Sequence, residues 1–164
     1  MSQTQPPAES VPQSPSLSAC SEPSGVRGTI LVVEDEAFVR NATCEILECE
    51  GYRVLRARNA LEAKLAFDRN LGVVALLLTD VVLPGQNGRA LARELRTTCP
   101  ALRTILTSGY PSNLAAGSAL GRGGIFYLPK PFSAQSLLQK VDQVLRKTDP
   151  QGRPRHACDN EWPA

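Results

Sequence analysis

Val73-Val-Ala-Leu-Leu-Leu-Thr-Asp80 decides the fold, because six apolar residues run without interruption up to a threonine and an acid. A short apolar run between polar residues is typical of a strand that is buried on both faces of a sheet. Thr29-Ile-Leu-Val-Val33 has the same character, and Glu34-Asp35-Glu36 follows it. The two runs therefore predict central strands of a parallel sheet, and each strand ends at carboxylates.

Shorter strand candidates lie at 52–55, 103–107 and 125–128, and helical patterns separate the strands. Helices are predicted before Gly51, after an Asn59 cap, over 88–98, over 112–120 and after a Ser133 cap. Strands that alternate with helices imply a parallel sheet with helices on both faces. Five such repeats predict a doubly wound α/β domain with a five-stranded sheet.

The apolar residues of the helices predict which faces pack. The first helix has apolar residues at helical spacing, and the second carries two leucines on one face. Cys44 and Cys49 are interpreted as packing residues of the first helix. The predicted apolar positions are Phe38, Val39, Ala42 and Ile46 in the first helix, Leu61 and Leu65 in the second, and Leu137, Leu138, Val141, Val144 and Leu145 in the last.

Composition sets the limits of the interpretation. The chain has 164 residues, a formal net charge of +2 and 42% hydrophobic residues, which fits one globular domain with tails. Residues 1–27 are rich in Pro and Ser and are expected to be a disordered tail, residues 28–147 to form the domain, and residues 148–164 to form a second tail.

Several classes of protein are disfavoured by the same composition. The net charge is too small to indicate nucleic-acid binding. No apolar run approaches the roughly 20 residues of a membrane span, and no signal peptide pattern is present, so we expect a cytoplasmic protein without a membrane partner. Five cysteines without a CxxC motif favour a reducing compartment. His156, the single histidine, lies in the predicted tail, so a hydrolase triad is not indicated.

Polar residues follow four of the predicted strands directly. Glu34 and Asp35 follow the first, Asp80 the third, Ser108 the fourth and Lys130 the fifth. The carboxyl ends of parallel strands meet at one edge, where such folds bind ligands. Converging carboxylates repel one another, and Mg²⁺ together with an ammonium group would offset that repulsion. This set of groups suits phosphoryl transfer to an aspartate, which depends on positioning and electrostatics.

Four blocks of the chain resemble the signature blocks of response-regulator receiver domains in two-component signalling. The resemblance covers residues 28–147 and implies the flavodoxin-like (βα)5 fold of that family. No single block is specific, but all four occur in order and each lies at the end of a predicted strand. The blocks are Ile30-Leu-Val-Val-Glu-Asp-Glu36, Leu78-Thr-Asp-Val-Val-Leu-Pro-Gly-Gln-Asn-Gly88, Leu106-Thr-Ser-Gly109 and Tyr127-Leu-Pro-Lys-Pro-Phe132.

The resemblance implies a role for each matched residue. Mg²⁺ is the implied cofactor, and the bond between Lys130 and Pro131 is typically cis in this family. The implied roles are phosphoacceptor for Asp80, metal binding for Glu34, Asp35, Asp80 and the backbone carbonyl of Val82, phosphate contact for Lys130, and conformational switching for Ser108 and Tyr127.

Two positions depart from the commoner pattern. Glu34 stands where Asp is more frequent, so its longer side chain is expected to reach the metal through water. Val82 places an apolar side chain beside the phosphoryl site and cannot orient a water molecule, which predicts a long-lived aspartyl phosphate. Tyr110, two residues after Ser108, is expected to shield the site further.

The family implies a function without conventional enzyme activity, limited to self-catalysed phosphoryl transfer and hydrolysis of the aspartyl phosphate. We expect a single-domain response regulator that takes a phosphoryl group from a histidine kinase, hybrid kinases included, or from a histidine phosphotransfer protein. It would then switch conformation to control a protein target. A second use, as a phosphate shuttle or sink in a phosphorelay, stays open.

Other functions are less well supported by the residues. An aspartate-nucleophile phosphatase would need a second Asp at the position of Val82. A dinucleotide-binding module would need a glycine-rich loop where Glu34-Asp35-Glu36 stands. A DNA-binding regulator would need an effector domain, and residues 148–164 are too few for one. A protein-interaction module of the same fold that is never phosphorylated remains an alternative.

Overall fold

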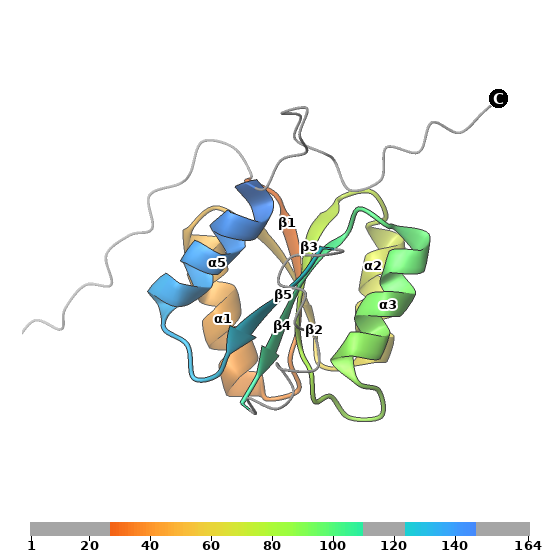
Figure 1. Ribbon diagram of the computed structural model, residues 1–164, viewed down its shortest axis with the longest axis horizontal. Coiled ribbons are helices and arrows are strands. Elements are labelled where there is room, and N and C mark those ends of the chain that lie inside the picture. Colours follow the sequence, from red (N-terminus) through yellow and green to blue (C-terminus); the bar gives the residue numbers. More distant parts are fainter. Residues whose placement is uncertain (1–26, 110–123, 147–164) are drawn as a thin grey trace, which may run out of the picture.

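The computed structural model describes residues 27–109 and 124–146 and has the expected α/β architecture (Figure 1). Strands and helices alternate along the chain within these ranges. The strands are β1 (Thr29–Val33), β2 (Arg53–Ala57), β3 (Val74–Asp80), β4 (Arg103–Ser108) and β5 (Ile125–Pro129), and the helices are α1 (Ala37–Cys49), α2 (Ala60–Arg69), α3 (Gly88–Thr98) and α5 (Ala134–Arg146).

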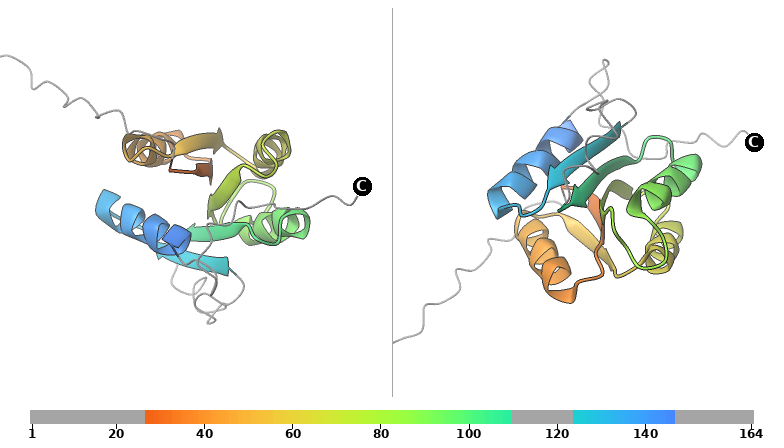
Figure 2. Two further views of the ribbon diagram at one scale, coloured as in Figure 1. Left: turned by 90° about the horizontal axis from the view of Figure 1, so that it is seen from above. Right: turned by 60° about the horizontal axis from the view of Figure 1, so that its bottom comes forward.

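The five strands form one parallel sheet in the order β2-β1-β3-β4-β5. Helices α1 and α5 cover one face of this sheet, and α2 and α3 cover the other (Figures 1 and 2). The sequence prediction of a five-stranded parallel sheet with helices on both faces is confirmed. The strand order reverses beside β1, which places the switch point between β1 and β3.

Each face of the sheet has its own apolar core. The cluster under α2 and α3 includes Leu31, Phe67 and Leu91, and the cluster under α1 and α5 includes Ile30, Leu47 and Leu137. Adjacent residues of one strand point to opposite faces, so Ile30 and Leu31 belong to different clusters. This explains why β1 and β3 are apolar at nearly every position.

The predicted faces of the first two helices were partly wrong. Phe38 of α1 is 80% exposed and Cys49 is also exposed, whereas Thr43, Cys44 and Leu47 face the sheet. In α2 the two predicted leucines point outward, and smaller residues take the inner face together with one aromatic ring. The residues concerned are Leu61 and Leu65 on the outside and Ala60, Ala63 and Phe67 on the inside.

Some sequence predictions fall outside the described residues, namely the two tails, the helix over 112–120, Tyr110 and His156. Within the described parts of the chain, no helix has both the length and the apolar character that a membrane crossing requires.

Candidate functional site

The ends of β1, β3, β4 and β5 bring the predicted residues to one edge of the sheet. Val33 pairs with Thr79, Asp80 with Thr107, and Ser108 with Pro129. The residues that follow these strands therefore lie in neighbouring positions along the edge, as expected for parallel strands.

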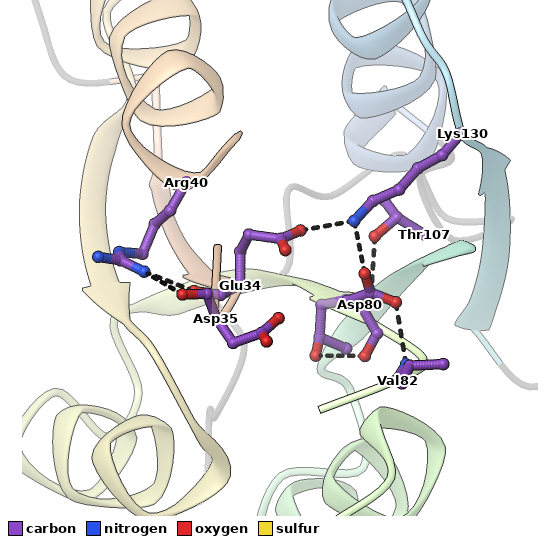
Figure 3. A network of polar contacts seen from close by, with 8 residues as sticks. Glu34, Asp35, Arg40, Asp80, Val82, Thr107 and Lys130 are labelled. Carbon is purple, nitrogen blue, oxygen red and sulfur yellow. Dashed lines mark hydrogen bonds and ion pairs between the residues drawn. The ribbon is translucent and has the colours of Figure 1, made fainter. Parts of the chain in front are cut away.

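Lys130 connects β1 and β3 through their acidic side chains (Figure 3). Its Nζ donates to Oε2 of Glu34 at 2.7 Å and to Oδ2 of Asp80 at 2.5 Å. The Glu34 side chain is only 8% exposed and that of Asp80 14%, so both ion pairs are largely shielded from water. Charge-assisted hydrogen bonds of this length in a partly dry site are stronger than surface ion pairs.

Burial and charge act in opposite directions on these groups. Burial raises the pKa of the Glu34 carboxyl more than the hydrogen bond and charge of Lys130 lower it. Burial alone would lower the pKa of Lys130, but its hydrogen bonds to Asp80 and Glu34 outweigh that effect, and the pKa is raised. Lys130 therefore stays charged at neutral pH, and one ammonium group neutralises only part of two carboxylates.

The loop after β3 fixes the second oxygen of Asp80. The backbone N–H of Val82 donates to Oδ1 at 2.9 Å, while the Val82 side chain is 59% exposed. Val81 donates its N–H to the carbonyl of Thr107 at 2.9 Å, which ties the start of this loop to β4. Among the described residues, each carboxylate oxygen of Asp80 thus has one donor, and an apolar side chain stands beside the group.

Ser108 ends β4, the strand next to that of Asp80, and Tyr127 lies on β5, one strand further along the sheet. Ser108 is 2% exposed, and its carbonyl accepts a hydrogen bond from the backbone N–H of Lys130 at 2.9 Å. Tyr127 is half-buried and pairs with Leu106, two residues before Ser108. Since side chains two apart share one face of a strand, Ser108 and Tyr127 lie on the same face of the sheet. The peptide bond between Lys130 and Pro131 is cis, as expected.

Arg40 is a residue of the site that the sequence analysis missed. Its Nη1 donates to the carbonyl of Glu34 at 2.8 Å and to that of Asp35 at 3.2 Å, so the guanidinium fixes the backbone of the acidic pair (Figure 3). A signal was present in the sequence. A cation in the first turn of a helix opposes the helix dipole, and a second interaction is needed to explain it.

Gly88, the last residue of the second block, has to lack a side chain because the backbone of Asp80 lies against it. A Cβ atom at this position would lie 1.9 Å from the carbonyl oxygen of Asp80. The N–H of Gly88 also donates to the carbonyl of Val81 at 2.9 Å. The first residue of α3 is therefore in direct contact with the backbone of the aspartate.

The donor set suits a hard divalent cation, although these side chains are not gathered around one point. Glu34 and Asp80 share Lys130, and Asp35 is exposed beside them. Among residues 27–109 and 124–146, no three acidic, histidine or cysteine side chains are grouped closely enough to ligate a metal ion. Carboxylate and carbonyl oxygens are nevertheless the ligands that Mg²⁺ prefers, and Asp35 is open to solvent for an incoming hydrated ion.

The family model of the response regulator receiver domain matches residues 30–142. The sensor kinase CckA of Brucella abortus is 37% identical over 74% of this chain, the transcriptional regulator NtrC of Azospirillum brasilense 33% over 74%, and the phosphate regulon regulator PhoB of Pseudomonas aeruginosa 35% over 74%. The chain spans 13%, 25% and 53% of the lengths of these three relatives. The matched module thus occurs in kinases as well as in DNA-binding regulators.

Solved structures agree with the sequence relatives. The receiver domain of the hybrid histidine kinase CckA has a TM-score of 0.62 and 34% identity, covering 72% of this chain and 99% of that one. A receiver domain protein from Clostridium thermocellum has a TM-score of 0.67 and 28% identity, covering 73% and 95%. The chain therefore belongs to the response regulator receiver domain family of two-component signalling.

Proposed function

We propose that Asp80 accepts a phosphoryl group and that this chain is a phosphorylation-controlled switch in a two-component system. The observation that carries the proposal is the pair of short contacts from Lys130 to Asp80 and Glu34. They put the aspartate at the sheet edge beside a cation that could contact a phosphoryl oxygen.

The proposed reaction forms one bond and breaks one bond. A carboxylate oxygen of Asp80 attacks the phosphorus of a phosphohistidine on a kinase or phosphotransfer protein, and an acyl phosphate forms. The P–N bond breaks, and its electron pair stays on the imidazole of the donor. The incoming group adds charge at the site, and Lys130 can move from the carboxylate to a phosphoryl oxygen without leaving the site.

Magnesium fits this chemistry, and four groups would hold it: the carboxylates of Glu34, Asp35 and Asp80 and the backbone carbonyl of Val82. A bound Mg²⁺ would neutralise negative charge on the transferring group. Arg40 would contribute by keeping the backbone of Glu34 and Asp35 in place. The donor bonds from Arg40 to both carbonyls support this role.

The phosphorylated state would be read through Ser108 and Tyr127. A phosphoryl group on Asp80 offers new acceptor oxygens to the Ser108 hydroxyl, and this biases an equilibrium between two conformations. We infer a protein target or a second phosphotransfer protein as the partner. One relative is named as a DNA-binding transcriptional regulator, and binding of nucleic acid by this chain is not part of the proposal.

The test is incubation with acetyl phosphate and Mg²⁺, followed by intact-mass measurement. We expect the wild type to gain one hydroxylamine-sensitive phosphoryl group and Asp80→Ala to gain none. Asp68→Ala, which removes an exposed aspartate from α2, is the matched control and should be labelled like the wild type. Labelling of Asp80→Ala, or no labelling of the wild type, would contradict the proposal.

The expected long lifetime of the aspartyl phosphate stays a prediction. Its support is the exposed, apolar side chain of Val82, which offers no group to orient an attacking water. Label loss from the purified phosphoprotein measures the lifetime, and Val82→Asn should shorten it severalfold by supplying a polar group at that position.

A further inference from the structure

Arg89 of α3 lies over the ring of Tyr127 in β5. Its guanidinium carbon is 5.2 Å from the ring centroid. This distance is within the range in which a cation is attracted to the face of an aromatic ring. The contact connects the helix that follows the phosphoacceptor to the aromatic residue on the last strand.

The ring is the main partner of this guanidinium. Within residues 27–109 and 124–146, Arg89 forms no ion pair, and its Nη2 is buried without a hydrogen-bond partner. A buried cationic nitrogen that lacks an acceptor is costly, so loss of the remaining ring contact would leave the charge poorly compensated. The guanidinium therefore favours the present position of the Tyr127 ring.

The backbone of Arg89 is held in place, so this residue cannot easily follow the Tyr127 ring if the ring moves. Its backbone N–H donates to Oδ1 of Asn87 at 2.8 Å, and the preceding Gly88 contacts the carbonyl of Asp80 directly. Helix α3 is thus fixed to the strand that carries the phosphoacceptor. Tyr127 lies on β5, which does not pair with β3, and on the same face as Ser108, so rotation about its own side-chain bonds would change the distance between its ring and Arg89 while α3 stays in place.

We propose that Arg89 is a positioning residue that holds Tyr127 in the unphosphorylated position and so sets how readily the switch turns. This inference rests on the proposed function of Asp80. Rotation of Tyr127 away from Arg89 breaks the contact, which adds to the free energy of the activated state. Removal of the cation should shift the equilibrium toward that state by between about twofold and thirtyfold.

The experiment labels the three tyrosines, Tyr52, Tyr110 and Tyr127, with 3-fluorotyrosine and follows them by fluorine NMR. Tyr127→Phe assigns the signal of interest. The reference for the activated state is the wild type with Mg²⁺ and beryllofluoride, which mimics a bound phosphoryl group. The variants are Arg89→Met, which keeps the length without the charge, Arg89→Lys, which keeps the charge, and Arg93→Met, an exposed arginine one turn further along α3.

Without beryllofluoride, Arg89→Met should move the Tyr127 signal toward the activated position and lower the half-saturating beryllofluoride concentration by about twofold to thirtyfold. Arg89→Lys should restore wild-type behaviour at least in part, and Arg93→Met should match the wild type. The inference is overturned if Arg89→Met leaves both readouts unchanged, or if Arg93→Met shifts them equally.

A second comparison guards against a merely structural effect. In a Tyr127→Leu background, Arg89→Met should give no further change in half-saturation, because the ring is already absent. The same fold-change in that background would overturn the inference. Circular dichroism confirms folding, and Arg89→Gln replaces Arg89→Met if the latter does not fold.

Failure of the proposed function is a separate result. In that case the wild type takes no phosphoryl group from acetyl phosphate. The comparison of the Tyr127 signal between wild type and Arg89→Met in donor-free buffer still decides whether Arg89 positions the ring.

Discussion

Glu34 carries a carboxylate into an almost fully buried position, where it shares one ammonium group with Asp80. Its raised pKa means that ionisation costs the folded state more than the unfolded state. The Glu34 carboxyl therefore stabilises the fold below its ordinary pKa and loses that contribution as the pH rises through its folded pKa. Ionisation of the Glu34 carboxyl therefore lowers the stability of the fold as the pH rises.

Glu34→Gln removes this ionisation and should consequently raise the free energy of unfolding in metal-free buffer on the alkaline side of the Glu34 titration. The amide oxygen can still accept from Lys130, so the ammonium keeps its partners. Urea unfolding measures the change, and Mg²⁺ should stabilise the wild type more than the variant. Glu36→Gln is the control, since Glu36 is exposed and its side chain forms no capping hydrogen bond. A stability loss in Glu34→Gln alone would contradict this account of the site.

Cys44 is a fully buried residue of α1, and burial raises the pKa of its thiol from 9.0 to about 11. The folded state therefore holds this proton to higher pH than the unfolded state does. Its contribution is fully present below pH 9.0 and is lost as the pH rises toward about 11. Ionisation of Cys44 should cost the wild type about 2 kcal/mol of stability by pH 11.

The measurement is denaturant unfolding of wild type and Cys44→Ala between pH 8 and pH 11, with those limits set by the thiol pKa values. Cys44→Ala should be less stable near pH 8, because it loses buried volume, and the difference should shrink by about 2 kcal/mol at the alkaline end. Cys49→Ala, which alters an exposed thiol in the same helix, should parallel the wild type. A constant difference across the range would disprove the assignment.

Helix α3 is the element that the site depends on most closely, because its first residue contacts the backbone of Asp80. Gly88→Ala would place a methyl group 1.9 Å from the Asp80 carbonyl oxygen, so the helix or the strand must shift. We expect a loss of about 1–3 kcal/mol in unfolding free energy, together with slower labelling by acetyl phosphate. Thermal unfolding and labelling rates report the two effects.

Gly109→Ala provides the matched control for that substitution. Gly109 follows Ser108 at the same edge, but a Cβ atom there meets no neighbour within 4 Å and its φ is not positive. Alanine should therefore be tolerated with wild-type stability. Equal effects of both substitutions would show that the contact between Gly88 and Asp80 is not the cause.

The central strands β1 and β3 were predictable because each is a nearly continuous apolar run. Thr29–Val33 matches the prediction, and the others differ by a residue or two at their ends. The helix faces were harder to predict. Apolar residues occur around much of α1, so the spacing of Phe38 and Ala42 competed with the face that carries Cys44 and Leu47. In α2 the close approach to the sheet favours alanine on the inner face. Hydrophobic periodicity alone does not predict that alanine, and not leucine, takes these positions.

The sequence predicted those contacts of the site that follow from the position of each residue after a strand. Asp80 and Lys130 meet because both follow parallel strands, and that follows from the topology. The contacts of Arg40 and Arg89 depend on the direction in which a long side chain extends from its helix. The sequence does not predict that direction. The positions of the strand ends therefore follow from the sequence pattern, whereas the side-chain contacts made from the helices required the structure.

On the scale of the whole molecule, a single sheet separates two apolar layers that share its strands. Ile30 and Leu31 are neighbours in β1 but belong to opposite clusters. Loss of packing in one layer therefore loosens strands that the other layer also needs. We expect the described domain to unfold as one cooperative unit.

Phe67→Ala in α2 and Leu137→Ala in α5 test this coupling from opposite faces. Both side chains are essentially inaccessible to solvent, so each truncation should cost about 2–5 kcal/mol. Hydrogen exchange of backbone amides provides the readout. In a cooperative domain, Phe67→Ala should lower the protection of α5 as much as that of α2. Leu137→Ala should likewise lower the protection of α2 as much as that of α5. If each substitution instead lowers protection only on its own face, the two layers unfold independently. The proposed phosphoryl-driven change at their shared edge would then have to affect both layers by a mechanism other than cooperative packing.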